Sequence, residues 1–120
     1  QKSTLDKKSG VLVSVIITCY NLEKYISRAI NSCINQTLPD DRYEIIVVDD
    51  CSTDGSWEII SQFSGLVTAI KSEKNGGVST ASNKGIAASS GKYVVRVDGD
   101  DFINKNFLHK SRTASFFACG

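Results

Sequence analysis

Three aspartates within four residues follow an apolar segment near the end of the sequence. Asp98, Asp100 and Asp101 come directly after residues 92–97, which have the pattern of a buried strand. Gly99 lets the chain turn tightly, so Asp98 and Asp100 can converge on one ion. Mg²⁺ and Mn²⁺ take oxygen ligands, and one or two carboxylates plus substrate phosphates suffice. A helix N-terminus explains one or two such aspartates but not three. The cluster therefore predicts a site for a cation that carries a diphosphate.

Asp50 belongs to a second acidic cluster, which follows the apolar segment 44–48. An EF-hand calcium loop would need a glutamate where this chain has Ser61, and a helix where it has a strand, so that interpretation fails. A dinucleotide site of the NAD type would need glycines after the first strand, and residues 18–22 contain none. The remaining interpretation is that Asp50 accepts a hydrogen bond from a base or a ribose, and that residues 52–54 cap the next helix.

Other candidate groups carry weaker signals. Tyr20 could pack against a planar base or could cover the edge of the sheet, and the sequence leaves both open. Residues 75–83 could bring backbone amides near a phosphate or a sugar, but a turn followed by a closely packed helix of small residues is favoured. His109, the only histidine, is interpreted as a surface residue, and Cys51 receives no catalytic role because no histidine or second cysteine lies near it in sequence.

Strand-like and helix-like segments alternate along the chain. Buried strands are predicted over 11–17, 44–48 and 92–97, and a further strand is predicted over 66–70. Helical spacing is found in Leu22, Tyr25, Ile26, Ala29, Ile30, Cys33 and Ile34, then in Trp57, Ile60 and Phe63, then in Val78, Ala81, Gly85 and Ile86, and a last helix is predicted over about 104–117. This alternation predicts a parallel sheet with helices on both faces. Ligands bind such sheets outside the carboxyl ends of the strands, where the candidate residues lie. Arg96 is expected on the face of Asp98, paired with an acidic group.

The composition is typical of one globular domain, with residues 1–10 as a polar lead-in and 11–120 as the domain. The chain has 120 residues, of which 41% are hydrophobic and 22% are charged. Its net charge of +1 produces no overall electrostatic field that would attract nucleic acid or an acidic membrane surface. Four cysteines without a CxxC pair favour reduced thiols in a cytoplasmic protein. No segment approaches the roughly 20 apolar residues of a membrane span, and no signal peptide is recognised.

The motifs taken in order resemble the nucleotide-sugar-binding half of the family 2 glycosyltransferases. They are residues 13–21, 45–55, 75–79, 91–93 and 98–101, and the match runs from about Val11 to Phe107. The resemblance implies an α/β, Rossmann-like fold of the GT-A type. It implies a nucleoside diphosphate sugar as donor, with a UDP-sugar favoured. The implied reaction is inverting transfer to a hydroxyl of a carbohydrate or glycolipid acceptor, in polysaccharide or glycoconjugate synthesis.

The resemblance also assigns roles to single residues. Binding of the nucleotide sugar is expected at Thr18, Tyr20, Asn21, Asp50, Asn75, Asn83 and Asp98. Asp98, Asp100 and Asp101 stand at the metal-binding DxD region of the family, so Mn²⁺ or Mg²⁺ is the expected cofactor and Asp100 the favoured ligand. The cation would offset the charge that develops on the leaving diphosphate.

The sequence departs from the family at three places. Many members have a proline at the position of Thr18 and an arginine at that of Ser82, where it would help to hold the donor. Members also continue into an acceptor-binding half that carries the general base, whereas this sequence ends at Gly120. We therefore expect a domain truncated after the DxD region, without a visible general base and with little transfer activity alone. It would belong to a longer protein at the inner face of the membrane. The alternative function is a non-catalytic assembly module that forms homo-oligomers through uncovered apolar surface.

Overall fold

The computed structural model describes residues 11–38, 40–105 and 107. Its elements are β1 (Val13–Cys19), α1 (Ile26–Ile34), the 3₁₀ helix η1 (Asp40–Arg42), β2 (Tyr43–Asp49), α2 (Ser56–Ser61), β3 (Thr68–Lys71), α3 (Gly77–Ala88) and β4 (Tyr93–Asp98). The predicted lead-in, most of the predicted last helix with His109, and Cys119 lie outside the described residues. Within the described part, no helix has the length and apolar character that crossing a membrane requires.

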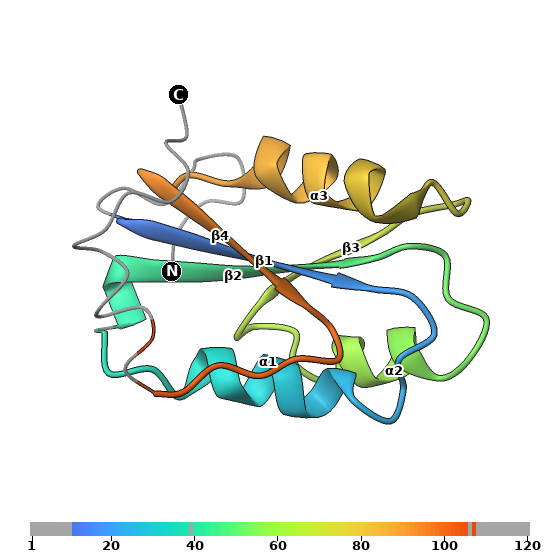
Figure 1. The fold of residues 1–120 in the computed structure, drawn as a ribbon, viewed down its shortest axis with the longest axis horizontal. Coiled ribbons are helices and arrows are strands. Elements are labelled where there is room, and N and C mark those ends of the chain that lie inside the picture. Colours follow the sequence, from blue (N-terminus) through green and yellow to red (C-terminus); the bar gives the residue numbers. More distant parts are fainter. Residues whose placement is uncertain (1–10, 39, 106, 108–120) are drawn as a thin grey trace.

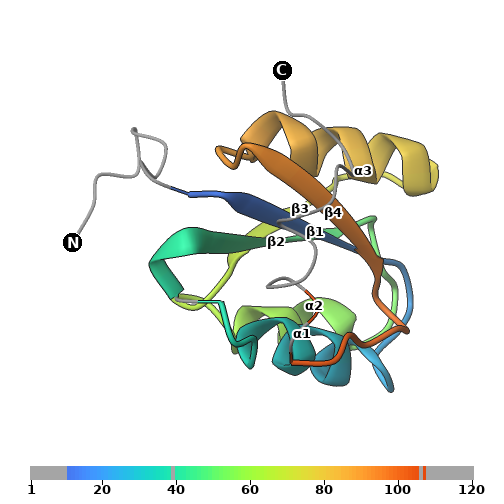
Figure 2. The same cartoon turned by 60° about the vertical axis from the view of Figure 1, so that its left-hand side comes forward.

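The sheet is parallel throughout and has the order β3-β2-β1-β4. Helices α1 and α2 cover one face and α3 covers the other (Figure 1), and the turned view shows the same three layers (Figure 2). The chain builds the sheet outward from β1 to β3 and then returns to place β4 on the other side of β1. The strand order therefore reverses between β1 and β4, where Thr18 lies opposite Asp98. The predicted fold class is confirmed.

The centre of the sheet is covered on both faces, which explains why β1 is mostly apolar. All seven residues of β1 are buried. On the α3 side, the core is formed by Ile16, Ile46, Val48, Ala81 and Val94. Gly85 of α3 lies so close to the sheet that a Cβ atom there would collide with the side chain of Ile16. Small residues on α3 thus allow its close approach to the strands, as the sequence predicted.

Four side chains that the sequence pattern places on helix or strand faces are exposed. Tyr25 is 46% exposed, because it precedes the first residue of α1 and does not follow the helical period. Val78 and Ile86 are also exposed, because the residues of α3 that pack on the sheet are the small ones between them. Arg96 is exposed on β4, the last strand of the sheet, and among the described residues it forms no ion pair. Long side chains therefore lie at the margins of these interfaces, where exposure is tolerated.

Candidate functional site

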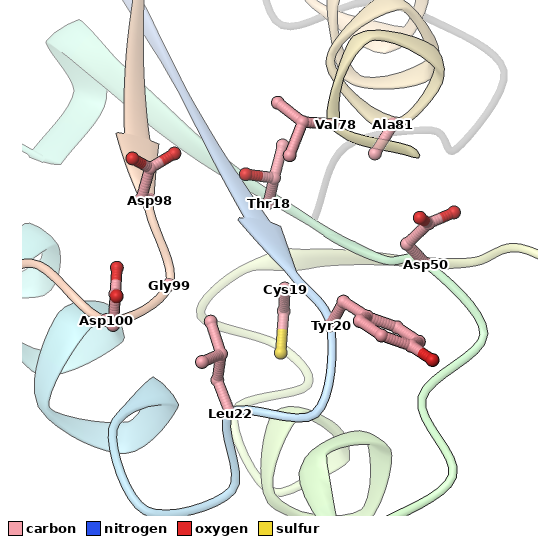
Figure 3. Close-up of a pocket in the computed structure, with 10 residues that line it drawn as sticks. All are labelled: Thr18, Cys19, Tyr20, Leu22, Asp50, Val78, Ala81, Asp98, Gly99 and Asp100. Atoms are coloured by element: carbon pink, nitrogen blue, oxygen red, sulfur yellow. The ribbon is translucent and has the colours of Figure 1, made fainter. Parts of the chain in front are cut away.

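A pocket of about 260 Å³ opens at the carboxyl ends of β1, β2 and β4, where the strand order reverses. It is lined by Thr18, Cys19, Tyr20, Leu22, Asp50, Val78, Ala81, Asp98, Gly99 and Asp100 (Figure 3). In Figure 3, Asp98 and Asp100 lie on one side of the end of β1, and Tyr20 and Asp50 lie on the other. The fold therefore brings together five of the residues predicted from sequence.

The acidic turn after β4 is held close to β1. The N–H of Gly99 donates to the carbonyl of Thr18 at 2.8 Å, and the N–H of Asp101 donates to the carbonyl of Asp98 at 3.0 Å. A Cβ atom on Gly99 would lie 2.8 Å from the Thr18 carbonyl oxygen, so only glycine fits without a shift of β1 or β4. Glycine at this position therefore fixes where Asp98 and Asp100 emerge.

The carboxylates of Asp98, Asp100 and Asp101 form an exposed cluster, each offering an oxygen within 4.8 Å of the others. Among the described residues, none of these three carboxylates accepts a hydrogen bond. Three like charges at this separation repel one another, and a divalent cation would neutralise most of that charge. Because the donor set consists only of oxygens, it fits a hard cation such as Mg²⁺ or Mn²⁺.

Arg28 of α1 supports the chain directly after this cluster. Its Nη2 atom donates to the carbonyl of Asp100 at 3.5 Å, and its guanidinium carbon lies 4.7 Å from the centre of the Phe102 ring. A guanidinium above an aromatic face is attracted by the ring quadrupole. Sequence reasoning missed Arg28, because its partners lie more than 70 residues away and nothing in the local pattern indicates them.

Asp50 is 4% exposed, and both of its carboxylate oxygens are engaged. Oδ1 accepts the N–H of Gly76 and Oδ2 accepts the N–H of Gly77, each at 2.9 Å, where α3 begins. The side chain of Asn75 donates to the main-chain carbonyl of Asp50 at 3.4 Å. A carboxylate has about four acceptor positions, so capacity for a ligand remains. The hydrogen-bond donors that its carboxylate already has, however, are N–H groups of the protein, and the sequence did not predict them.

Asn21 does not line the pocket but ties two loops together. Its Oδ1 accepts the N–H of Thr53 at 2.7 Å and the N–H of Asp54 at 3.3 Å, and its own N–H donates to Ser52 Oγ at 2.9 Å. Its φ angle of 54° lies in the left-handed region, which asparagine adopts more readily than most residues. Asn21 thereby fixes the neighbouring Tyr20 relative to the loop after β2.

The loop after β2 is ordered by its own carboxylates. Asp49 is fully buried and accepts the N–H and the hydroxyl of Ser52. Asp54 accepts the N–H of Ser56, the first residue of α2, although Gly55 is the N-cap residue. Burial acts to raise the pKa of Asp54, but hydrogen bonds from the hydroxyl and N–H of Ser56 outweigh it, so the pKa lies below its usual value.

Three further predicted ligand residues lie outside the pocket lining, and two other residues near the site, Ser82 and Cys19, are buried. Asn75 and Asn83 are exposed and do not line the pocket, and Asp101 lies just beyond it. Ser82, at the position of the family's arginine, is buried, and its hydroxyl has no hydrogen-bond partner in the described part of the chain. Burial raises the pKa of the Cys19 thiol to about 11, so this pocket residue stays protonated and is a poor nucleophile at neutral pH.

The structure is an α/β domain with a pocket at the carboxyl edge of a parallel sheet. The sequence profile described as "Glycosyl transferase family 2" matches residues 14–111. The chain therefore belongs to this family.

Three relatives illustrate the match. The poly(ribitol-phosphate) beta-glucosyltransferase of Bacillus spizizenii is 38% identical over 100 residues, which are 80% of this chain and 16% of that protein. The structure of TarS 1-349 from S. aureus in complex with UDP-GlcNAc has a TM-score of 0.80 at 36% identity, covering 86% of this chain and 30% of that one. The mannosyltransferase PcManGT from Pyrobaculum calidifontis, in complex with GDP-Man and Mn²⁺, has a TM-score of 0.72 at 26% identity, covering 80% and 30%. The chain thus has the GT-A fold of these transferases and spans less than a third of their lengths.

Proposed function

We propose that this chain is the donor-binding region of an inverting glycosyltransferase and binds a nucleoside diphosphate sugar together with Mn²⁺ or Mg²⁺. The observation that carries the proposal is the two-sided pocket, with exposed carboxylates on one side and Tyr20 with Asp50 on the other. A UDP-sugar is the favoured donor. UDP-GlcNAc in the TarS structure, and GDP-Man with Mn²⁺ in the mannosyltransferase structure, support the proposal.

The acidic side of the pocket suits the diphosphate. Asp98, Asp100 and Asp101 would hold the cation, which would supply positive charge to the diphosphate as the leaving group. Phosphates and carboxylates are both anionic, so without a cation they would repel each other. We therefore expect the affinity for a nucleoside diphosphate to depend strongly on a divalent cation.

The opposite side suits the nucleoside. The Tyr20 ring is 47% exposed beside the pocket and offers a face on which a planar base can stack. Asp50 has acceptor capacity for an N–H of the base or a ribose hydroxyl, and Thr18 lies between the two sides in Figure 3. Ligand pockets usually measure about 300–1,000 Å³. At about 260 Å³, this pocket would leave part of the donor exposed, so we expect modest affinity.

Calorimetry with UDP and GDP, with Mn²⁺ and with EDTA, tests the proposal. UDP is expected to bind in Mn²⁺, and removal of the metal or Asp100→Asn is expected to weaken binding by about tenfold or more, a change of about 1.4 kcal/mol. Asp41→Asn is the matched control, because Asp41 is exposed before β2, at the opposite end of the sheet, and it should change the affinity by less than about twofold. Absence of UDP binding, or binding indifferent to metal and to Asp100→Asn, would contradict the site.

For the protein that contains this region, we propose transfer to a hydroxyl of a carbohydrate or glycolipid acceptor in the cytoplasm. The name of the Bacillus relative, a poly(ribitol-phosphate) beta-glucosyltransferase, supports an acceptor of this class. Inversion is the stereochemistry that the family resemblance implies, and we assign no general base to the described residues. NMR analysis of the product's anomeric configuration tests this proposal, and a retained configuration would contradict it.

A further inference from the structure

Asp50 makes two of its hydrogen bonds where a helix most needs acceptors. The first N–H groups of a helix have no acceptor within the helix, and negative charge is favourable at that end. The carboxylate of Asp50 meets both needs, because it accepts the N–H of Gly76, the N-cap residue of α3, and that of Gly77, the first residue of the helix. One buried side chain at the end of β2 thus holds the start of a helix that lies 26 residues further along the chain.

The turn that Asp50 holds depends on this attachment. Gly77 has a φ angle of 89°, a conformation that residues with a side chain rarely adopt. Among the described residues, no side chain of the turn 75–77 itself caps α3. The two hydrogen bonds to the Asp50 carboxylate and the freedom of the glycines therefore help to set the conformation of the turn, beside the bond from the Asn75 side chain to the Asp50 main-chain carbonyl.

The same helix forms part of the pocket wall. Val78 and Ala81 of α3 line the pocket, and Val78 directly follows Gly77. Figure 3 shows the two side chains on the α3 side of the pocket, above the end of β1. Ala81 is buried against the sheet, whereas Val78 is 53% exposed. The place of Val78 therefore depends on the first turn of α3 more than on core packing.

We propose that Asp50 is a positioning residue, whose carboxylate clamps the first turn of α3 and thereby sets the Val78 wall of the pocket before any ligand binds. This inference rests on the proposed function for the identity of the ligand. It adds to that function a second role for Asp50, which acts on donor binding through α3 in addition to any direct contact with the nucleotide.

Amide hydrogen exchange of the free chain tests the clamp without any ligand. In Asp50→Asn, the side-chain NH₂ group cannot accept a hydrogen bond, so one of the N–H groups of Gly76 and Gly77 loses its acceptor. We expect exchange at residues 76–78 to become about tenfold faster or more. The control Asp41→Asn should leave exchange at 76–78 unchanged. Unchanged exchange in Asp50→Asn would overturn the clamp.

A double-mutant cycle then tests the link to the pocket. The affinity for UDP in Mn²⁺ is measured for the wild type, Asp50→Asn, Val78→Ala and the double variant. If Asp50 acts through the Val78 wall, the two effects are not additive, and the double variant binds at least about threefold more tightly than the product of the single effects predicts. Additivity within about twofold would overturn the link.

Two further outcomes are distinguishable. If the wild type does not bind UDP, the proposed function fails, while hydrogen exchange still decides whether the clamp exists. If Asp50→Asn does not fold, Gly77→Ala tests the same turn from the helix side. Nothing lies within 4 Å of the added Cβ, so the change acts only on the backbone, whose left-handed conformation at residue 77 becomes about tenfold or more less favourable. It should speed exchange of the Gly76 N–H and weaken UDP binding. If Gly77→Ala changes neither the exchange of the Gly76 N–H nor the affinity for UDP, the proposal is overturned.

Discussion

Replacement of Asn21 by alanine should loosen the contact between the two loops that form the Tyr20 side of the pocket. The change removes the oxygen that accepts the N–H groups of Thr53 and Asp54, and it places alanine at a φ angle of 54°. Asn21 does not line the pocket, so the expected effect on ligand binding is indirect. This variant therefore separates loop order from direct contact.

The magnitude follows from these two losses. A hydrogen bond typically contributes about 0.5–1.5 kcal/mol net, and the two N–H groups lie in an exposed loop where water can replace the lost acceptor, so about 1–2 kcal/mol is expected for the pair. A left-handed conformation costs alanine a further amount of about 1–2 kcal/mol. Asn21→Ala should therefore lower the free energy of unfolding by about 2–4 kcal/mol. Asn21→Gly, which keeps the backbone unstrained, should lose about 1–2 kcal/mol.

Urea denaturation followed by tryptophan fluorescence measures these differences. Trp57 is the only tryptophan, and the Nζ atom of Lys71 lies 5.5 Å from the centre of its ring in the native structure, so its emission should report unfolding. The urea midpoint should shift while the slope stays constant. Asn21→Asp, which keeps an acceptor and tolerates the left-handed region, should remain within about 0.5 kcal/mol of the wild type at high salt.

Two results would refute this reasoning. If Asn21→Ala is as stable as the wild type, the contact between the loops does not contribute to stability. If Asn21→Gly is less stable than Asn21→Ala, the backbone at this position is not strained for alanine and the left-handed conformation is not what matters. Calorimetry adds a third check, because loss of loop order next to Tyr20 should weaken UDP binding several-fold, in the same rank order as stability.

The remaining predictions concern packing, an unpaired hydroxyl and pH. Gly85→Ala should lower the free energy of unfolding by about 1–3 kcal/mol in urea denaturation, because its Cβ would collide with Ile16, whereas Ser79→Ala at an exposed position of α3 should not be destabilising. Ser82→Ala removes a buried hydroxyl without a described partner, so it should raise the free energy of unfolding by about 1 kcal/mol and increase the urea midpoint accordingly. Because the pKa of Asp54 is lowered from its usual 3.8, its contribution to stability is present above pH 3.8 and is lost as pH falls through the folded value. The difference in unfolding free energy between wild type and Asp54→Asn should therefore shrink as the pH falls below 3.8. A difference that stays constant down to the lowest pH measured would contradict the lowered pKa of Asp54.

The sequence was sufficient to predict that the sheet is parallel and covered by helices on both faces. Continuous apolar segments with few polar residues predict strands covered on both faces, and their alternation with helical segments predicts parallel order. From that order alone, the carboxyl edge of the sheet follows as the place of Thr18, Asp50 and Asp98. These predictions succeed because burial and period are properties of a single segment, readable without knowledge of its neighbours.

The partners of the polar side chains could not be predicted in the same way. Asp50 bonds to residues 26 and 27 positions away, and Asn21 to residues 32 and 33 positions away. Such contacts depend on how loops at the edge of the sheet meet, which no local pattern encodes. A positive φ angle at Asn21 and at Cys51 was equally invisible, because both residue types also occur in ordinary conformations. Asparagine and aspartate in loops after strands can therefore connect two loops by hydrogen bonds, as Asn21 and Asp50 do here.

The two acidic clusters look alike in sequence but differ in what surrounds their carboxylates. Asp49 and Asp50 are buried, and each accepts two hydrogen bonds from protein N–H or hydroxyl groups. Asp98, Asp100 and Asp101 are exposed, lie close together, and among the described residues receive no hydrogen bond to their carboxylates. A buried carboxylate with donors in place is already compensated, so it gains little from a cation. A cluster of uncompensated charges gains much from one. The partners of each aspartate, more than its spacing in sequence, therefore favour the turn after β4 as the place for a metal and the loop after β2 as the framework of the pocket.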